Sequence, residues 1–475
     1  MSHWRSQLNN YHGSRALGHI AQTIGVQVDK LNFLAAAAVS LIIAYIFSYV
    51  LHAGRVPPAL RKFLIIVVGS TSLSFCFGRD MFATIGEALI GYVLIRCTPI
   101  DVMPQITLVF SVGYLLTLHG IRQYRDPGGY TMDITGPLMM LTQRISALAF
   151  SIRDGSTTST MNRHLTQQQR ENAVAKMPDP LSYFAYAFDF HTVLAGPYIP
   201  FKVFVNIAEG GNYSQLVRRK VQHLQVVRKL CLVVFLSYVI LKCGPLLSAD
   251  DLLSEWYHGL SFARKLLYLV TFAALYRLQY YAAWKLSEAV CVASGYGFYV
   301  AETGEERSDG AENINIVEVE TASSIKVLID NWNISTQRWL KHVCHDRDIS
   351  CKTVRTFLLS AVWHGLYPGY FISFFSVMYF VTASREVRRH VRPRVIARGA
   401  VMKGLYDATT CCFTTVFIAY GAVPFVFLEL QKGLRFWGEL YFFGHILALF
   451  PFLLRLFFKS RTLRHSSDFT HFKSS

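Results

Sequence analysis

The sequence from Thr356 to Ser384 reads TFLLSAVWHGLYPGYFISFFSVMYFVTAS and contains no Asp, Glu, Lys or Arg in 29 residues. A helix that crosses a bilayer needs about 20 apolar residues, so this run is long enough to span a membrane with some tilt. It contains His364, whose ring exchanges a proton near neutral pH. Ionisable side chains inside membrane segments are costly and tend to face a cavity or a polar partner. His364 is therefore either a functional residue or a neutral, hydrogen-bonded histidine that packs two helices together.

The rest of the chain also has the composition of a membrane protein. Of its 475 residues, 52% are hydrophobic and 16% are charged, whereas soluble domains have about 25% charged residues. Apolar runs recur along the sequence, and no Gly/Ser-rich or Pro-rich linker divides it. The runs cover 31–54, 63–78, 102–121, 230–241, 356–384, 408–428 and 440–454, with weaker candidates at 81–95, 136–152, 182–200 and 266–300.

We predict an all-α, polytopic membrane protein with about 9–11 transmembrane helices. Residues 1–30 form an N-terminal polar segment in this prediction, 31–459 form a single membrane domain, and 460–475 form a C-terminal tail. No internal repeat of fixed period is present, which argues against a transporter built from duplicated halves.

The charge balance is strongly basic, with 47 Lys and Arg against 30 Asp and Glu, a net charge of +17. The basic residues are dispersed between the apolar runs, as in the cytosolic loops of membrane proteins. We therefore expect contact with membrane lipids and no binding to nucleic acid. The six arginines between Arg385 and Arg398 predict a cytosolic loop.

Other familiar site chemistries have no support in the sequence. The nine cysteines show no CxxC and no paired metal spacing, so we expect neither a disulfide framework nor a metal site. No GxSxG, phosphate-binding glycine loop or HExxH is present.

The segment DNWNISTQRWL at 330–340 supplies polar groups that lie close in sequence to His364. Asn333 offers both a carbonyl acceptor and an amide donor. An amphipathic helical stripe with aromatic ends is expected beside it, formed by Trp332, Trp339, Leu340 and Val343. The alternative for Asn333 is a helix cap or a surface amide.

These segments resemble the paired signature of the membrane-bound O-acyltransferases. The resemblance lies in 330–340 and in the Trp-His-Gly segment at 358–370, and it implies that Asn333 and His364 are the catalytic residues. Further similar blocks follow the same order along the chain, at 133–144, 183–186, 194–197, 277–284 and 295–298. The Asp-Asn-Trp-Asn and Tyr-Pro-Gly-Tyr forms are most similar to the enzymes that reacylate lysophosphatidylethanolamine, lysophosphatidylserine or lysophosphatidylcholine.

The resemblance implies a lysophospholipid O-acyltransferase of the endoplasmic reticulum membrane that serves phospholipid remodelling. It would transfer a long-chain acyl group from acyl-CoA, as co-substrate without a further cofactor, to the free glycerol hydroxyl of a lysophospholipid. His364 would be the general base, and Asn333 would orient a reacting group or stabilise the thioester oxyanion. We expect direct transfer in a central tunnel, with substrate-binding candidates Trp332, Trp363, Tyr367, Tyr370, Tyr280 and Tyr281.

The sequence leaves three alternatives open. A protein-lipidating acyltransferase of the same family shares the chemistry but needs an opening for a peptide. A secondary transporter also places polar residues at the midplane, yet it should show duplicated halves and ion-coupling carboxylates. A non-catalytic scaffold of the same fold need not retain both Asn333 and His364.

Overall fold

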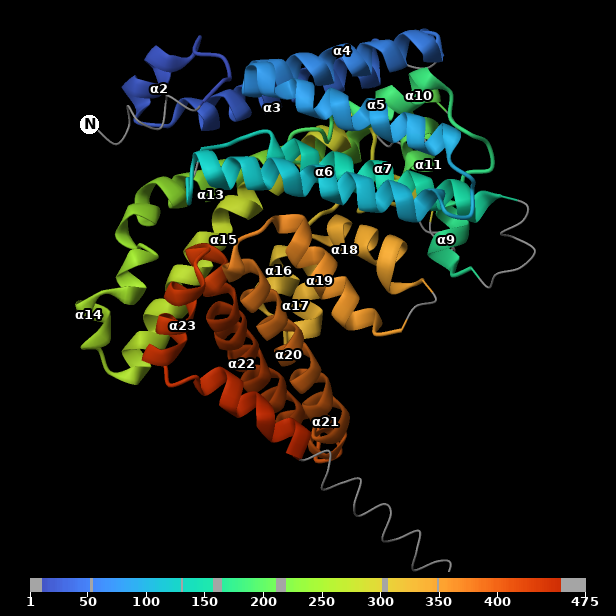
Figure 1. The fold of residues 1–475 in the computed structure, drawn as a ribbon. Helices are drawn as coiled ribbons and strands as arrows, with labels where there is room; N and C mark the ends of the chain where they lie inside the picture. The colour runs from blue at the N-terminus through green and yellow to red at the C-terminus, as the bar shows by residue number, and fades with distance from the viewer. Residues whose placement is uncertain are drawn as a thin grey trace, which may run out of the picture. The chain divides into compact units, whose positions relative to one another are not determined.

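The computed structural model describes residues 11–51, 54–129, 131–156, 165–210, 219–300, 306–347 and 350–453. These residues are mostly helical (Figure 1). The strands found among them form one antiparallel pair, β1 (Tyr299–Val300) with β2 (Glu306–Arg307). The all-α fold class is therefore confirmed, while the C-terminal tail expected at 460–475 lies outside the described residues.

Several helices are long and apolar enough to cross a membrane. Five such helices occur in the described part of the chain, at Val28–Tyr49, Pro58–Cys97, Met103–Arg125, Val221–Leu253 and Ala400–Phe427. A bent pair, Leu430–Glu439 with Phe443–Leu453, makes a sixth if it is counted as one span. A polytopic membrane protein is thus confirmed. The number of such helices is below the predicted count because several of the predicted apolar runs form shorter or more polar helices.

The run from Thr356 to Ser384 is the clearest such case, because it does not form one helix. Helix α19 (Lys352–His364) ends at the histidine, and helix α20 (Pro368–His390) starts four residues later. Gly365 separates them with φ 128° and ψ −165°, a conformation that residues with a Cβ rarely adopt. Pro368 then starts α20 at the first helical position, where its missing N–H costs nothing. His364 is therefore placed at a helix end, where backbone carbonyls lack partners within the helix.

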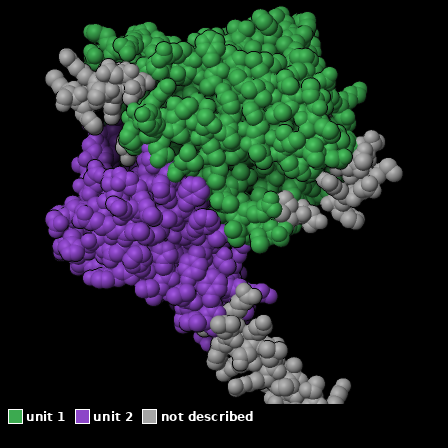
Figure 2. Space-filling model, in the orientation of Figure 1, with its two compact units in different colours: residues 1–239, 278–314, 333–366 green, residues 240–277, 315–332, 367–475 purple. Residues whose placement is uncertain are grey.

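The chain separates into two compact units (Figure 2). Unit 1 comprises residues 1–239, 278–314 and 333–366. Its complete elements are α2 (Gly18–Ile24), α3 (Val28–Tyr49), α4 (Pro58–Phe77), η1 (Gly78–Asp80), α5 (Met81–Cys97), α6 (Met103–Arg125), α7 (Thr135–Gly155), α9 (Gln167–Asn172), α10 (Pro180–Ala187), α11 (Phe201–Glu209), β1, β2, α18 (Ile334–Leu340), the π-helical turn η4 (Lys341–His345) and α19. Helices α13 (Arg219–Cys243) and α15 (Phe262–Ala293) contribute residues to both units.

Helix α7 is the central helix of unit 1. It packs against α5, α6, α9, α10, α18 and η4, and its side chains are buried on every face. A helix without an exposed face belongs to the core of a bundle. Apolar residues such as Leu138, Ile145 and Leu148 fill this core, and polar residues of α7 bind neighbouring helices. Helix α7 therefore contacts α18, which directly follows Asn333, and binds Trp363 of α19.

Unit 2 comprises residues 240–277, 315–332 and 367–475. Its elements are η2 (Gly244–Leu246), η3 (Asp250–Leu253), α14 (Glu255–His258), α16 (Ile316–Glu320), α17 (Ile325–Asn331), α20, α21 (Arg392–Ile396), α22 (Ala400–Phe427), α23 (Leu430–Glu439) and the helix Phe443–Leu453. Helix α20 packs against α17, α21, α22 and α23.

The sequence predicted a loop for the arginine-rich segment from Arg385 to Arg398, and this prediction is wrong. Its first part is the end of α20, and most of the rest is α21. Cations near a helix C-terminus interact favourably with the helix dipole, which is why Arg388 and Arg389 extend α20 rather than end it. The segment nevertheless exposes most of its arginines.

Candidate active site

Two hydrogen bonds join helix α18 to helix α7. The Gln143 amide donates to the Thr336 hydroxyl across 2.9 Å, and the Trp339 indole N–H donates to the Ser146 hydroxyl across 2.9 Å. The second bonded residue comes three positions after the first in both helices, Ser146 after Gln143 and Trp339 after Thr336. The two helices therefore run in the same direction at this contact. Residues three apart lie on the same face of a helix.

Both predicted catalytic residues belong to segments that bind α7. Asn333 directly precedes α18, whose Thr336 binds Gln143 of α7. From α19, the indole N–H of Trp363 donates to the carbonyl of Met139 across 3.0 Å. The Trp339 and Trp363 rings also pack, with centroids 5.8 Å apart. The segments that carry Asn333 and His364 therefore both bind α7, and they contact each other through Trp339 and Trp363.

The backbone of Asn333 is unusual for a residue that precedes a helix. Its φ of 47° and ψ of 53° lie in the left-handed region, which asparagine tolerates better than most residues. Its side chain makes no cap hydrogen bond to α18. The helix-cap role that the sequence left open for Asn333 is therefore not the one it has here.

Asn313 caps α18 in its place. The Asn313 carboxamide oxygen accepts from the Ser335 backbone N–H at 3.0 Å and from the Ser335 hydroxyl at 2.6 Å. The Asn313 carbonyl accepts from the Ile334 N–H at 2.7 Å. Because another segment satisfies the start of α18, the Asn333 amide is left for a different partner.

A buried ion cluster holds Asn313. The Glu288 carboxylate, which is 0% exposed, accepts from the backbone N–H groups of Asn313 and Ile314 at 2.8 and 3.2 Å. Lys285 and Lys229 bind the same carboxylate at 2.7 and 2.5 Å. A buried carboxylate is tolerated when it is paired and hydrogen-bonded in this way. Sequence analysis missed this cluster, because Glu288, Lys285 and Asn313 form no motif.

His364 is half-buried at the end of α19. Its ring meets Trp363 edge to face, with centroids 4.8 Å apart. Trp363 is itself 2% exposed and is fixed by Met139 and Trp339. Trp363 thus anchors His364 to the bundle core. These contacts explain the burial of Trp363 without the predicted contact between Trp363 and substrate.

The other predicted substrate-binding residues are divided between the units. In unit 1, Tyr281 is fully buried in α15 and Tyr280 packs near Trp284, with centroids 5.8 Å apart. In unit 2, Tyr367 and Tyr370 meet edge to face at the start of α20, with centroids 5.9 Å apart. Substrate contact by these tyrosines stays a prediction.

Trp332 departs from the expected amphipathic stripe. It caps the C-terminus of α17 in an extended conformation, whereas α18 starts two residues later. The left-handed turn at Asn333 separates the two helices, so Trp332 does not share a helical face with Trp339. Trp332 belongs to unit 2, and its role in substrate binding also stays a prediction.

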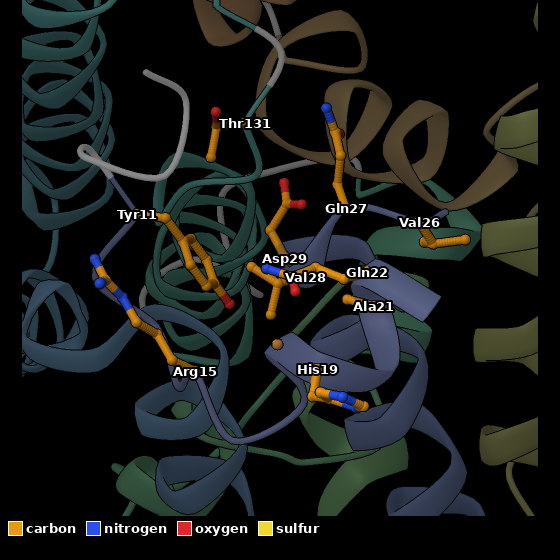
Figure 3. A pocket seen from close by; sticks show the side chains of 11 residues that line it. Tyr11, Arg15, His19, Ala21, Gln22, Val26, Gln27, Val28, Asp29 and Thr131 are labelled. Carbon is orange, nitrogen blue, oxygen red and sulfur yellow. The ribbon is translucent and has the colours of Figure 1, made fainter. Parts of the chain in front are cut away.

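A cavity of about 370 Å³ lies near the N-terminal end of unit 1 (Figure 3). None of the predicted site residues lines it. It is lined by Tyr11, Arg15, Gly18, His19, Ala21, Gln22, Val26, Gln27, Val28, Asp29 and Thr131. Asp29 accepts from the Met132 N–H at 2.8 Å, which connects α3 to the segment that leads into α7.

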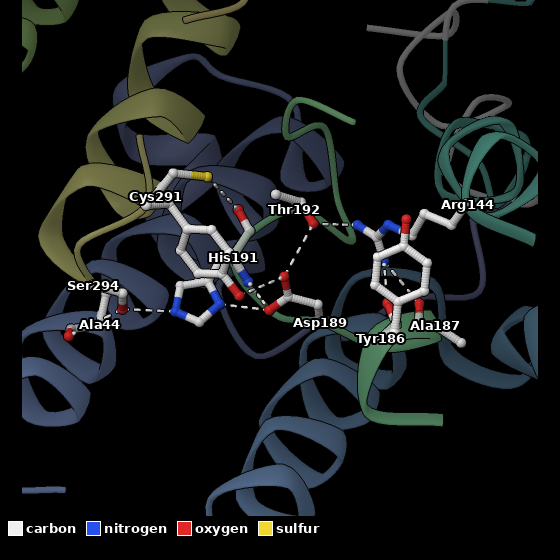
Figure 4. Close-up of polar contacts among 10 residues, drawn as sticks. Ala44, Arg144, Tyr186, Ala187, Asp189, His191, Thr192, Cys291 and Ser294 are labelled. Carbon is white, nitrogen blue, oxygen red and sulfur yellow. Dashed lines mark hydrogen bonds and ion pairs between the residues drawn. The ribbon is translucent and has the colours of Figure 1, made fainter. Parts of the chain in front are cut away.

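A second polar cluster contains a Ser–His–Asp chain (Figure 4). The Ser294 hydroxyl lies 2.6 Å from His191 Nε2, and His191 Nδ1 lies 2.5 Å from Asp189. However, the Ser294 hydroxyl donates to the Ala44 carbonyl at 3.1 Å, so its proton is bound to backbone rather than offered to His191. The chain therefore connects α3, the segment after α15 and the segment after α10, and we assign it a structural role.

Arg144 extends the same cluster from α7 (Figure 4). Its guanidinium donates to the carbonyls of Tyr186 and Ala187 at 3.2 and 2.8 Å and also to the Thr192 hydroxyl. These carbonyls lie at the C-terminal end of α10, where intrahelical partners are lacking. Arg144 thus caps α10 from the core of the bundle.

Comparison with known proteins identifies the family. The family model described as MBOAT, membrane-bound O-acyltransferase family, matches residues 121–423. The chain belongs to the membrane-bound O-acyltransferase family. The matched region contains α7, Asn333 and His364, and the resemblance predicted from the sequence is confirmed. The protein is accordingly a multi-pass membrane O-acyltransferase.

Similar proteins cover nearly the whole chain. It is 34% identical to lysophospholipid acyltransferase 6 of Drosophila melanogaster, in an alignment that covers 96% of this chain and 66% of that protein. It is 33% identical to membrane-bound glycerophospholipid O-acyltransferase 1 of Mus musculus, over 92% of both chains. It is 30% identical to the lysophospholipid acyltransferase of Saccharomyces cerevisiae, over 81% of this chain and 68% of that protein.

Proposed function

We propose that this protein is an acyl-CoA:lysophospholipid O-acyltransferase that acts in phospholipid remodelling. The proposal rests on Asn333 and His364, which belong to two segments bound to the same helix α7, in a chain similar to relatives named for this activity. The proposed acceptors have ethanolamine, serine or choline headgroups, and the proposed donor is a long-chain acyl-CoA.

The chemistry follows from the two side chains. His364 takes the proton of the acceptor hydroxyl while the hydroxyl oxygen attacks the thioester carbonyl, and general-base catalysis of this kind typically contributes about 10²–10⁴-fold. The C–O bond forms, the C–S bond breaks, and His364 returns the proton to the CoA thiolate. The Asn333 amide, which α18 does not use, donates to the oxygen that gains charge. The acyl group passes directly to the acceptor without an acyl-enzyme.

Location and substrate access belong to the same proposal. We place the protein in the endoplasmic reticulum membrane, with the exposed arginines of α20 and α21 in the cytosol. Acyl-CoA then arrives from the cytosolic side, where basic residues attract its phosphates. The lysophospholipid arrives from the bilayer.

The test is a panel of acceptors presented to the purified protein with a long-chain acyl-CoA, with release of CoA as the readout. Lysophospholipids with ethanolamine, serine or choline headgroups should give the highest kcat/KM, and a chelator should leave the rates unchanged. A preference for a peptide would favour a protein-lipidating acyltransferase. A preference for a sterol or diacylglycerol would also reject the proposed acceptor class.

A further inference from the structure

A second histidine lies beside the proposed catalytic one. His119 is on α6, in an apolar run comparable to the one that contains His364, and it is only 9% exposed. Helices α6 and α19 pack against each other. The contact is close at the next residue, because a Cβ at Gly120 would lie 3.6 Å from Leu366, two residues beyond His364.

The His119 imidazole holds the end of α19. It is hydrogen-bonded to the backbone of Trp363 and interacts electrostatically with His364. The N–H of Trp363 is used inside α19, so the carbonyl is the group that His119 meets. A carbonyl only accepts, and the bonded nitrogen of His119 therefore carries a hydrogen. His119 thus serves one of the carbonyls that the helix end leaves without a partner.

The other nitrogen of His119 is the unexplained group. His119 Nε2 is buried and has no hydrogen-bond partner among the described residues. Since Nδ1 carries the hydrogen of the neutral ring, Nε2 is a bare lone pair that requires a donor. Arg122, one turn further along α6, binds Asp133 at 3.1 Å and the carbonyls of Gly129 and Thr131 instead. A helix cap alone does not require a ring with a second, buried acceptor.

We propose that His119 is a positioning residue for His364. Its Nδ1–H donates to the Trp363 carbonyl, next to His364 in the chain, and its Nε2 accepts a hydrogen bond from the ring N–H of His364. This inference rests on the function proposed above. Accepting one N–H of His364 fixes its tautomer, so that the opposite nitrogen is bare and faces the acceptor hydroxyl. The hydrogen bond forms in the substrate-loaded enzyme, as catalytic hydrogen bonds often tighten on binding. His119 keeps its own proton throughout and supplies only the hydrogen bond.

Two substitutions separate the two nitrogens. In His119→Asn the amide nitrogen replaces Nδ1 and still donates to Trp363, but nothing replaces Nε2. In His119→Gln the longer side chain places an amide oxygen near the position of Nε2. We expect His119→Asn to keep the melting temperature and the KM for acyl-CoA while kcat falls at least tenfold. His119→Gln should retain a kcat at least threefold above that of His119→Asn.

The outcomes distinguish the inference from the function on which it rests. Wild-type kcat in His119→Asn would reduce His119 to a cap of α19, and equal losses in both variants would also overturn the inference. If His119→Asn is destabilised, His119→Gln against the apolar His119→Met makes the same comparison. His364→Ala is measured beside them. An active His364→Ala would refute the proposed chemistry itself, whereas an inactive one with a fully active His119→Asn refutes only the inference.

Discussion

Replacing Asn313 by alanine should reduce turnover although Asn313 is not proposed to touch substrate. The substitution removes the oxygen that accepts from the Ser335 N–H and hydroxyl, and both residues are 2% exposed. A buried donor left unsatisfied costs about 1–3 kcal/mol. This support stabilises the left-handed turn at Asn333, and without it the Asn333 side chain is free to cap α18 itself. At about 1.4 kcal/mol per tenfold change, the competent conformer falls by about 5- to 150-fold, which is an upper bound for the loss in kcat.

The matched control is Asn315→Ala. Asn315 is also an asparagine that caps a helix, because its side chain accepts from the Glu318 N–H at 3.2 Å at the start of α16. Loss of either cap costs a similar amount of helix stability, about 1 kcal/mol. Both variants are purified in detergent and compared for kcat, KM and melting temperature by CoA release. Equal losses of kcat in the two folded variants would refute a specific role of Asn313 in holding Asn333.

Asn333→Ala should lose most activity and Asn331→Ala less, because Asn331 already donates to Val327 inside α17; steady-state rates that fall equally and slightly would show that the site is misplaced. A cysteine introduced at the exposed Arg389 should be labelled by a membrane-impermeant reagent in sealed microsomes, above the labelling of the parent protein; protection until detergent is added would reverse the orientation. Burial, with a contribution from nearby charge, lowers the pKa of His342 to about 4. The neutral ring therefore favours the folded state above the unfolded pKa of about 6.5, and this contribution is lost as the pH falls from about 6.5 to 4. The melting temperature of His342→Gln should accordingly fall less between pH 7 and pH 5 than that of the wild type, and parallel curves would contradict this.

The sequence predicted the fold class and the family because both depend on local patterns. Apolar runs of membrane length predict helices wherever these lie in the fold. The Trp-His-Gly segment predicted a catalytic role for His364 without information on the residues that pack around it. The break at Gly365 was also visible as Gly and Pro within an apolar run, but hydropathy alone joined α19 and α20 into one span. A single left-handed turn at Asn333 likewise divided a stripe that looked continuous.

The supporting residues could not be predicted because their contacts connect distant parts of the chain. Asn313 binds Ser335, 22 residues further along the chain, and its own backbone is held by Glu288. His119 gave the same signal as His364, a histidine within an uncharged apolar run, and that signal could have identified it. The position of His119 next to α19 depends on the packing of α6 against that helix, which the sequence does not show. Motifs thus predicted the reacting groups, whereas three-dimensional packing showed which residues contact their segments.

The general-base role of His364 is tested by the turnover of purified His364→Ala with a lysophospholipid acceptor and acyl-CoA. The variant should remain folded, with a melting temperature close to that of the wild type, because the core contacts at this end of α19 are made by Trp363. Its kcat should fall by about 10²–10⁴-fold, as expected for the loss of a general base. Turnover like that of the wild type in the folded variant would exclude His364 as the general base.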